Sequence, residues 1–234
     1  MSLSFRLWTD VLQLFFPDSC PGCGETLRQH DARICARCSA RLPYTGFRGG
    51  TGNPVEKVFW GRTPVQAATA VFYFAKTGLL QKLVHDCKYR GRRDLALYLG
   101  GCMGKVLQED SSFGPVTLVV PVPLHRRRQR QRGYNQAALL AEGIAGVLCR
   151  PCASDVLRRT KNTGTQTRRS RTARWENMAD AFALSKPEAV AGAHILLVDD
   201  VLTTGATLDA CAAVLSAAPG ARLSIATLAY AGEL

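Results

Sequence analysis

The stretch "HILLVDDVLTTGATLDACAAVL", residues 194–215, combines three local patterns that decide the fold of this 234-residue chain. The run at 194–198, apolar after its first residue, predicts a buried strand. Two acids, Asp199 and Asp200, follow directly; then come a threonine-rich turn and a helical pattern at 206–217. A strand, a polar turn and a helix in this order are typical of α/β proteins, whose ligands bind beyond the carboxyl ends of the strands.

The rest of the chain also alternates apolar strands with helical patterns. The predicted strands are 67–74, 116–124 and 222–231, and the predicted helices are 78–88, 94–108 and 134–149. Pro121 and Pro123 end the ability of the 116–124 strand to pair. This alternation predicts an α/β fold with a mostly parallel sheet that is covered on both faces.

Two Cys-x2-Cys pairs lie near the N-terminus. Each pair can present two thiolates to one ion, and four thiolates complete a tetrahedral zinc site with no open position. We therefore predict a structural zinc ion in an N-terminal module of residues 1–50. The predicted zinc ligands are Cys20, Cys23, Cys35 and Cys38. The glycine-rich segment 46–54 has the composition of a linker, so we place the start of the larger domain, residues 51–234, there.

The remaining cysteines and the termini give weaker signals. Cys149 and Cys152 share the x2 spacing and could form a redox pair, but they end an apolar helical pattern with no second pair nearby. The N-terminal segment has the pattern of an amphipathic helix rather than a signal peptide, because an acid interrupts its apolar run. No window reaches the roughly 18 apolar residues of a membrane helix. We expect a cytoplasmic protein without membrane insertion.

The turn that follows the two acids suits a phosphate. The first turn of a helix offers unpaired N–H groups and the positive end of its dipole, and Gly205 leaves the backbone accessible. The predicted 5-phosphate-binding residues are Thr203, Thr204, Gly205, Ala206 and Thr207. Asp199 and Asp200 would repel a phosphate, but they suit ribose hydroxyls with Mg²⁺. A ribose that carries a 5-phosphate satisfies both halves of the motif.

The segment "VDDVLTTGAT", residues 198–207, resembles the loop of type I phosphoribosyltransferases that binds phosphoribosyl pyrophosphate (PRPP). The resemblance implies that Asp199 and Asp200 hold the ribose hydroxyls as catalytic residues, and that the turn cradles the 5-phosphate. It also implies Mg²⁺ as the metal that accompanies PRPP. Purine-salvage relatives place an acid where this chain has Thr203, so their general base has no counterpart here.

Further motifs are similar to those of the ComF family, which includes competence-associated and GntX-like proteins. They are the two cysteine pairs, "KYRG" at 88–91, "VPVPLHRRRQRQRGYNQAALLA" at 120–141 and the arginine-rich stretch at 158–182. The resemblance implies that the loop after the 116–124 strand contacts pyrophosphate, and that 158–174 takes the place of the mobile hood loop. The implied pyrophosphate-binding residues are Val122, Pro123, Leu124, Arg128 and Arg132.

Most of the chain's net charge of +12 lies in one segment. Residues 121–175 hold 12 Arg and one Lys against Glu142 and Asp155, a net charge of +11. Arginine side chains match phosphate oxygens, so the segment suits PRPP. A basic groove that includes Tyr134 and Trp175 would also serve single-stranded nucleic acid, and a solvated basic face is a third interpretation.

Two hypotheses about function follow. In the first, the protein is a transferase that moves phosphoribose from PRPP to an unidentified acceptor, and the family resemblance links it to DNA uptake. Mg²⁺ and positive side chains would then stabilise the pyrophosphate leaving group. In the second, it is a non-catalytic accessory protein that senses PRPP or handles single-stranded DNA.

Overall fold

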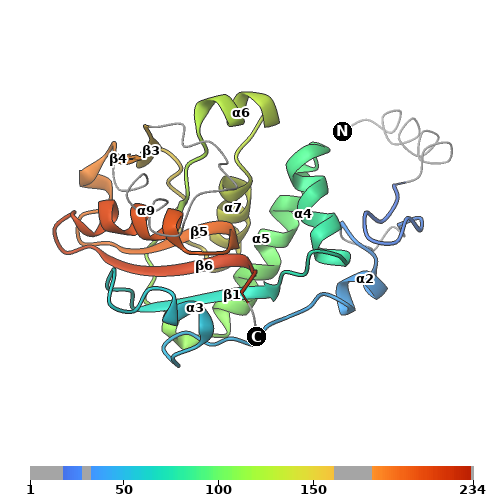
Figure 1. The fold of residues 1–234 in the computed structure, drawn as a ribbon, viewed down its shortest axis with the longest axis horizontal. Helices are drawn as coiled ribbons and strands as arrows, with labels where there is room; N and C mark the ends of the chain where they lie inside the picture. Colours follow the sequence, from blue (N-terminus) through green and yellow to red (C-terminus); the bar gives the residue numbers. More distant parts are fainter. Residues whose placement is uncertain (1–17, 28–32, 161–180, 233–234) are drawn as a thin grey trace.

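The computed structural model describes residues 18–27, 33–160 and 181–232. The predicted N-terminal helix and most of the arginine-rich stretch at 158–182 lie outside these residues. A four-stranded parallel sheet with the order β1-β6-β5-β2 forms the centre (Figure 1). Its strands are β1 (Ala67–Tyr73), β2 (Leu118–Pro121), β5 (His194–Leu202) and β6 (Arg222–Tyr230). The predicted α/β class and parallel sheet are confirmed.

Helices cover both faces of the sheet, as predicted. The first face packs against α4 (Leu79–Tyr89), α5 (Arg93–Gln108) and α7 (Gln136–Leu148). The second face packs against α3 (Pro54–Lys57), α9 (Ala206–Ser216) and the antiparallel pair β3 (Leu157–Arg159) and β4 (Phe182–Leu184). Short helices complete the described chain: α2 (Ala36–Ala40), α6 (Arg126–Arg132), η1 (Ser111–Phe113) and η2 (Pro187–Ala189).

Successive side chains of β5 enter different cores. Leu196 and Val198 join the core that includes α4, α5 and α7, whereas Ile195 and Leu197 join the core beneath α9. Side chains alternate between the two faces along a strand, so an uninterrupted apolar run is what a sheet covered on both faces requires. The same alternation determines where the two acids that follow Val198 are directed.

Helices α5 and α7 pack closely because each has a glycine against the backbone of the other. A Cβ atom at Gly100 would lie 2.3 Å from the carbonyl oxygen of Leu140, and one at Gly143 would lie 2.4 Å from that of Leu97. Any side chain at these two positions would push the helices apart. The N-terminus of α7 lies beside the carboxyl end of β2, where Asn135 Nδ2 donates to the Val122 carbonyl at 2.9 Å.

Two strands differ in length from the prediction. β5 continues past Val198 to Leu202, because the long apolar strand β6 supplies pairing partners as far as Tyr230. The strand expected at 116–124 is shorter and ends at Pro121. Pro121 itself pairs with Val198, which a proline can do here because β2 is an edge strand.

The arginine run that follows β2 forms helix α6, which the sequence did not predict. Its sequence is RRRQRQR, and none of its residues is buried. Without apolar residues at helical spacing, the segment gives no periodic signal. The helix is held at its ends, where His125 accepts a hydrogen bond from the Arg127 N–H and Gly133 adopts a left-handed conformation.

The cysteine-rich module packs directly on the larger domain. Cys20, Cys35 and Cys38 are buried in the same core as α4 and α5. The glycine-rich segment that follows is also held in place, since the Gly49 N–H donates to Asp110 Oδ2 at 2.8 Å. The division after residue 50 stays a prediction, but the two parts share one core.

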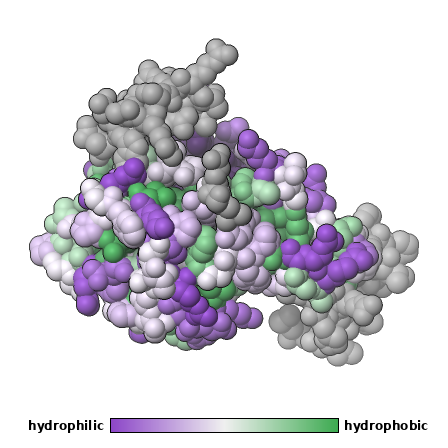
Figure 2. All heavy atoms as spheres, turned by 60° about the horizontal axis from the view of Figure 1, so that its bottom comes forward, coloured by the Kyte–Doolittle hydropathy of each residue, from purple (hydrophilic) through white to green (hydrophobic). Residues whose placement is uncertain are grey.

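The surface of the described residues is mixed. On the face shown in Figure 2, hydrophobic side chains form small patches between hydrophilic ones. Among the described residues, the helices are all too short or too polar to cross a membrane.

Candidate functional site

Asp199 and Asp200 lie inside β5, beyond the point where β2 ends. The ladder between these strands finishes where the Val122 N–H donates to the Val198 carbonyl at 2.8 Å. Past it, each carboxylate accepts a hydrogen bond from the next backbone N–H: Asp199 Oδ1 from Asp200 at 2.8 Å, and Asp200 Oδ1 from Val201 at 2.7 Å. The two acids therefore stand near the carboxyl end of a central strand, where its β2 side is no longer paired, and this is the position where α/β sheets bind ligands.

Asp200 is directed to the face of the sheet that α4 covers. Its Oδ2 lies 2.5 Å from Lys88 Nζ, and each of these side chains is 22% exposed. Lys88 is in the last turn of α4, so the helix delivers a positive charge to the end of β5. Lys88 belongs to the "KYRG" motif at 88–91, but its pairing with Asp200 could not be predicted from the sequence.

Asp199 is directed to the opposite face, towards α9 and β3. Its pKa is raised from 3.8 to about 7, first by burial and second by the charge of Asp200; Lys88 and Arg159 act in the other direction. The charge of Asp199 in turn helps burial to raise the pKa of the Cys211 thiol in α9. A carboxylate in these surroundings gains from a bound cation. The two carboxylates are oxygen ligands of the type that Mg²⁺ takes together with substrate phosphates.

We expect Asp199→Asn to stabilise the fold at pH 8. Because the folded pKa is raised, the folded state binds more protons than the unfolded state between about pH 4 and pH 7, so stability falls as the pH rises through this window. Asparagine has no carboxyl group to ionise, so the variant avoids the cost of a buried negative charge at this position. The variant should gain roughly 1–2 kcal/mol at pH 8, after allowance for partial exposure, and a melting temperature a few degrees higher.

Thermal unfolding between pH 4 and pH 8 measures this effect. The curves of the wild type and the variant should coincide near pH 4 and separate as the pH rises. Equal melting temperatures across the range would show that the carboxylate is not destabilised by its surroundings.

The predicted phosphate turn follows β5 and begins α9. Gly205 adopts a left-handed conformation with φ of 78° as the N-cap of this 11-residue helix. A Cβ atom at Gly205 would lie 2.5 Å from Val58 Cγ1. The glycine is therefore required by its backbone conformation and by Val58, in addition to the predicted access for an anion. Thr203 is exposed, Thr204 and Thr207 are half-buried, and Ala206 is buried.

The predicted pyrophosphate loop offers few backbone donors. The Val122 N–H is used in the sheet, and the Val122 carbonyl accepts a hydrogen bond from Asn135 Nδ2 at 2.9 Å. Pro123 has no N–H. Of the three loop residues, Leu124 alone retains a backbone N–H that the sheet does not use.

The two predicted arginine ligands lie on α6. Arg132 packs back on the domain: its Nη1 donates to Gln136 Oε1 at 2.9 Å, and its guanidinium lies 5.4 Å from the ring centroid of Tyr89. Arg128 lies close enough to Arg159 that its charge adds to burial in lowering the Arg159 pKa. The structure thus places Arg128 of α6 and Arg159 of β3 near each other on the side that Asp199 faces, whereas Arg132 lies on the side of α4.

The four predicted zinc ligands come together. The sulfur atoms of Cys20, Cys23, Cys35 and Cys38 all lie within 4.8 Å of one another. The Cys23 and Cys35 sulfurs are 3.6 Å apart, close to the value of about 3.8 Å that a tetrahedral site with zinc–sulfur bonds of about 2.3 Å requires. The Cys35 N–H donates to Cys20 Sγ at 3.3 Å, which orients that sulfur. The residues fit a structural zinc ion.

Cys149 and Cys152 gain no support as a redox pair. Both thiols are free, and burial raises the pKa of Cys152 to about 11. Reactive thiols have lowered pKa values.

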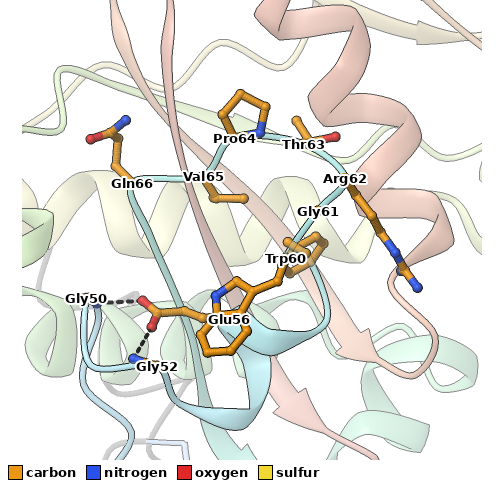
Figure 3. Close-up of a pocket in the computed structure, with 11 residues that line it drawn as sticks. Gly50, Gly52, Glu56, Trp60, Gly61, Arg62, Thr63, Pro64, Val65 and Gln66 are labelled. Atoms are coloured by element: carbon orange, nitrogen blue, oxygen red, sulfur yellow. Dashed lines mark hydrogen bonds between the residues drawn. The ribbon is translucent and has the colours of Figure 1, made fainter.

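A cavity of about 550 Å³ lies elsewhere, around the loop that joins α3 to β1 (Figure 3). The carboxylate of Glu56 is held there by the N–H groups of Gly50 and Gly52, and the indole of Trp60 stands beside it. None of the predicted site residues lines this cavity. The concave surface is separate from the acid pair.

Two protein-family models match the chain. The phosphoribosyl transferase domain model matches residues 135–234, and the double zinc ribbon domain model matches residues 11–48. The first match includes the acid pair and the turn after β5. The second match includes all four cysteines of the metal site.

Individual relatives agree with these matches. The DNA utilization protein YhgH of Salmonella typhi is 33% identical over 192 residues, which are 81% of this chain and 80% of the relative. Competence protein F of Haemophilus influenzae is 43% identical over 93 residues, which are 39% of this chain and 40% of the relative. Competence protein ComFC of Bacillus subtilis is 37% identical over 91 residues, which are 39% of this chain and 35% of the relative. With its zinc ribbon followed by a phosphoribosyltransferase domain, the chain belongs to the ComF family.

Proposed function

We propose that this protein binds PRPP with Mg²⁺ at the carboxyl end of β5 and transfers its phosphoribose to an acceptor. The observation that carries the proposal is the placement of two carboxylates and Lys88 next to the helix-initiating turn at 203–207. The carboxylates suit the ribose hydroxyls, and the turn suits the 5-phosphate. A phosphoribosyl group is the ligand that uses both.

Each part of the site has a distinct task in this proposal. Asp199 and Asp200 accept hydrogen bonds from the ribose hydroxyls and hold the ring. The N–H groups and hydroxyls of residues 203–207 bind the 5-phosphate at the N-terminus of α9. Leu124 N–H and Arg128 lie on the side proposed for the pyrophosphate.

Mg²⁺, when bound, would neutralise part of the charge of the pyrophosphate leaving group. Asp199 and Asp200 are the side chains that would hold it, because carboxylates beside substrate phosphates form the usual Mg²⁺ site. Lys88 balances the charge of Asp200 and so reduces the repulsion between the acid pair and the phosphates of PRPP. Positive charge develops on the ribose as the bond to pyrophosphate breaks, and the two carboxylates stabilise it.

The names of the relatives link the proposed chemistry to DNA. Relatives are a DNA utilization protein and competence proteins, so we propose that phosphoribosyl chemistry serves DNA uptake in this protein as well. The nine cysteines include no disulfide among the described residues. Free thiols and PRPP both suit the cytoplasm, where we place the protein.

A second candidate function is a non-catalytic accessory protein that senses PRPP or handles single-stranded DNA. The arginine helix α6 favours it, because none of its residues is buried and most of its charge faces solvent. A cavity of about 340 Å³ beside this helix is lined by Arg126, Arg158 and Arg159, which suits phosphates of a polyanion. Release of pyrophosphate from PRPP, alone and with a panel of bases and amines, separates turnover from binding.

We expect Lys88→Met to weaken the binding of Mg²⁺-PRPP by roughly 10- to 100-fold. The substitution leaves Asp200 without its counter-charge beside Asp199, so the anionic ligand meets stronger repulsion. Titration calorimetry at pH 7.5 measures the loss. Lys186→Met is the matched control, because it removes the lysine of a mostly exposed ion pair with Asp155 and should keep the affinity of the wild type. Equal affinities of the two variants for Mg²⁺-PRPP would show that Lys88 does not contribute to binding.

A further inference from the structure

Tyr89 is a large aromatic residue that the fold leaves exposed next to the proposed site. It occupies the last position of α4, directly after Lys88, and 66% of its surface is exposed. Most tyrosines of a folded domain bury at least their ring. The proposed binding of PRPP assigns no task to this ring.

The ring of Tyr89 is nevertheless held in place. The guanidinium of Arg132 lies over it at 5.4 Å from the centroid, and the ring of His85 lies 4.9 Å away at an interplanar angle of 44°. Arg132 is itself fixed by its hydrogen bond to Gln136 at the start of α7. Tyr89 thus presents an ordered aromatic surface to solvent, which lowers the entropy lost when a ligand stacks on it.

The charge around Tyr89 is positive. Arg90 has a 68% exposed side chain, and Arg132 lies over the ring. Arg93 is exposed one turn further along the chain, above the ring of Tyr134. The nearby acid, Asp86, is buried and forms an ion pair with Arg90 at 3.4 Å, so its charge already has a partner. The partner of this surface is therefore an anion with flat rings.

We propose that Tyr89 is a stacking platform for a base of single-stranded DNA, whose phosphates follow the arginines of α6. Proteins that bind single strands combine a basic groove with aromatic side chains on which bases stack, and Arg adds cation–π contacts. α6 joins α4 at this place, because Arg132 of α6 lies on Tyr89 of α4. The inference rests on the DNA-handling part of the proposed function.

The chain provides a matched control in Trp60. The residue Trp60 is 63% exposed, close to the value for Tyr89, and lies in the α3–β1 loop (Figure 3). Its neighbour Phe59 belongs to the core on the opposite face of the sheet from α4. Both rings are mostly exposed, and neither residue belongs to a hydrophobic core cluster of the described chain. If the two variants differ in their affinity for DNA, the cause is therefore the position of the lost ring and not the loss of an exposed aromatic side chain in general.

Binding of a fluorescein-labelled thymidine oligonucleotide, followed by anisotropy from 50 to 300 mM salt, tests the proposal. Tyr89→Ala should lose roughly 5- to 150-fold in affinity, the range for one stacked base, with an unchanged salt slope. Tyr89→Phe and Trp60→Ala should stay within about twofold of the wild type. The triple variant with Gln at Arg126, Arg127 and Arg130 should instead flatten the salt slope by about 2, because each phosphate contact contributes about 0.7.

Several results would overturn the inference. They are an unchanged affinity of Tyr89→Ala, a loss as large in Trp60→Ala, or the absence of oligonucleotide binding by the wild type at the lowest salt. Thymidine monophosphate that competes as well as the oligonucleotide would show a nucleotide site in place of a strand site. Calorimetry with Mg²⁺-PRPP on the same variants keeps the two proposals apart, since Tyr89→Ala should bind PRPP as the wild type does.

Discussion

The double variant Asp199→Asn, Asp200→Asn is expected to lose Mg²⁺-PRPP binding by at least about 100-fold. Asparagine keeps the size of each side chain and an oxygen acceptor, but it removes the negative charges that a divalent cation requires. It also replaces the charge-assisted hydrogen bonds to the ribose hydroxyls by neutral ones, which are roughly half as strong. Titration calorimetry with PRPP and Mg²⁺ measures the loss directly.

The fold of this double variant should survive. Each carboxylate accepts a hydrogen bond from the next backbone N–H, and the amide oxygen of asparagine can still accept it. Asp155→Asn, at a side chain that is 61% exposed, controls for the loss of an acid elsewhere and should bind PRPP normally. Undiminished PRPP binding by a folded double variant would refute the proposed site.

Purified protein is expected to carry one zinc ion per chain, and Cys20→Ser should release it and lower the melting temperature by more than 10 °C. Structural zinc sites contribute their binding free energy to folding. The effect should extend beyond residues 1–50, because Cys20 is 1% exposed and lies in one core with Leu80 and Leu83 of α4. Hydrogen exchange should show loss of protection in residues 33–42 and also in α4.

The exposed thiol of Cys149 provides the control for zinc. Cys149→Ser should keep the metal and the melting temperature, since this residue lies outside the cysteine cluster. Elemental analysis without zinc in freshly reduced protein would count decisively against the metal site. Loss of protection confined to residues 33–42 would show that the cysteine-rich module unfolds independently of the larger domain.

The central motif could be predicted from the sequence because its parts are local. The strand, the acid pair, Gly205 and the helix follow one another within 22 residues, and each has its own periodicity or backbone requirement. The four cysteines are equally local, because their spacing alone indicates one metal site. The structure confirms the parallel sheet and the cysteine cluster.

Other features depend on tertiary contacts and left no periodic signal. Lys88 reaches Asp200 only because α4 packs across the end of β5, more than 100 residues later in the chain. The extension of β5 to Leu202 depends on its partner β6, and the local sequence with two acids argues against a strand. The run of arginines in α6 indicated a basic surface, but without apolar residues at helical spacing it did not indicate a helix.

Helix α4 contacts both the zinc module and the proposed ligand site. The two contacting residues are on the same helix, so their separation along the helix axis and their rotation about it are fixed. Lys82 Nζ donates to the Gly22 carbonyl at 3.1 Å, and Lys88 meets Asp200 six residues later. Six residues of α-helix span about 9 Å, and one inserted residue would rotate everything beyond it by about 100°. An insertion or deletion between Lys82 and Lys88 would therefore turn Lys88 away from Asp200. The length of this helical segment sets the distance and the orientation between the cysteine module and the proposed PRPP site.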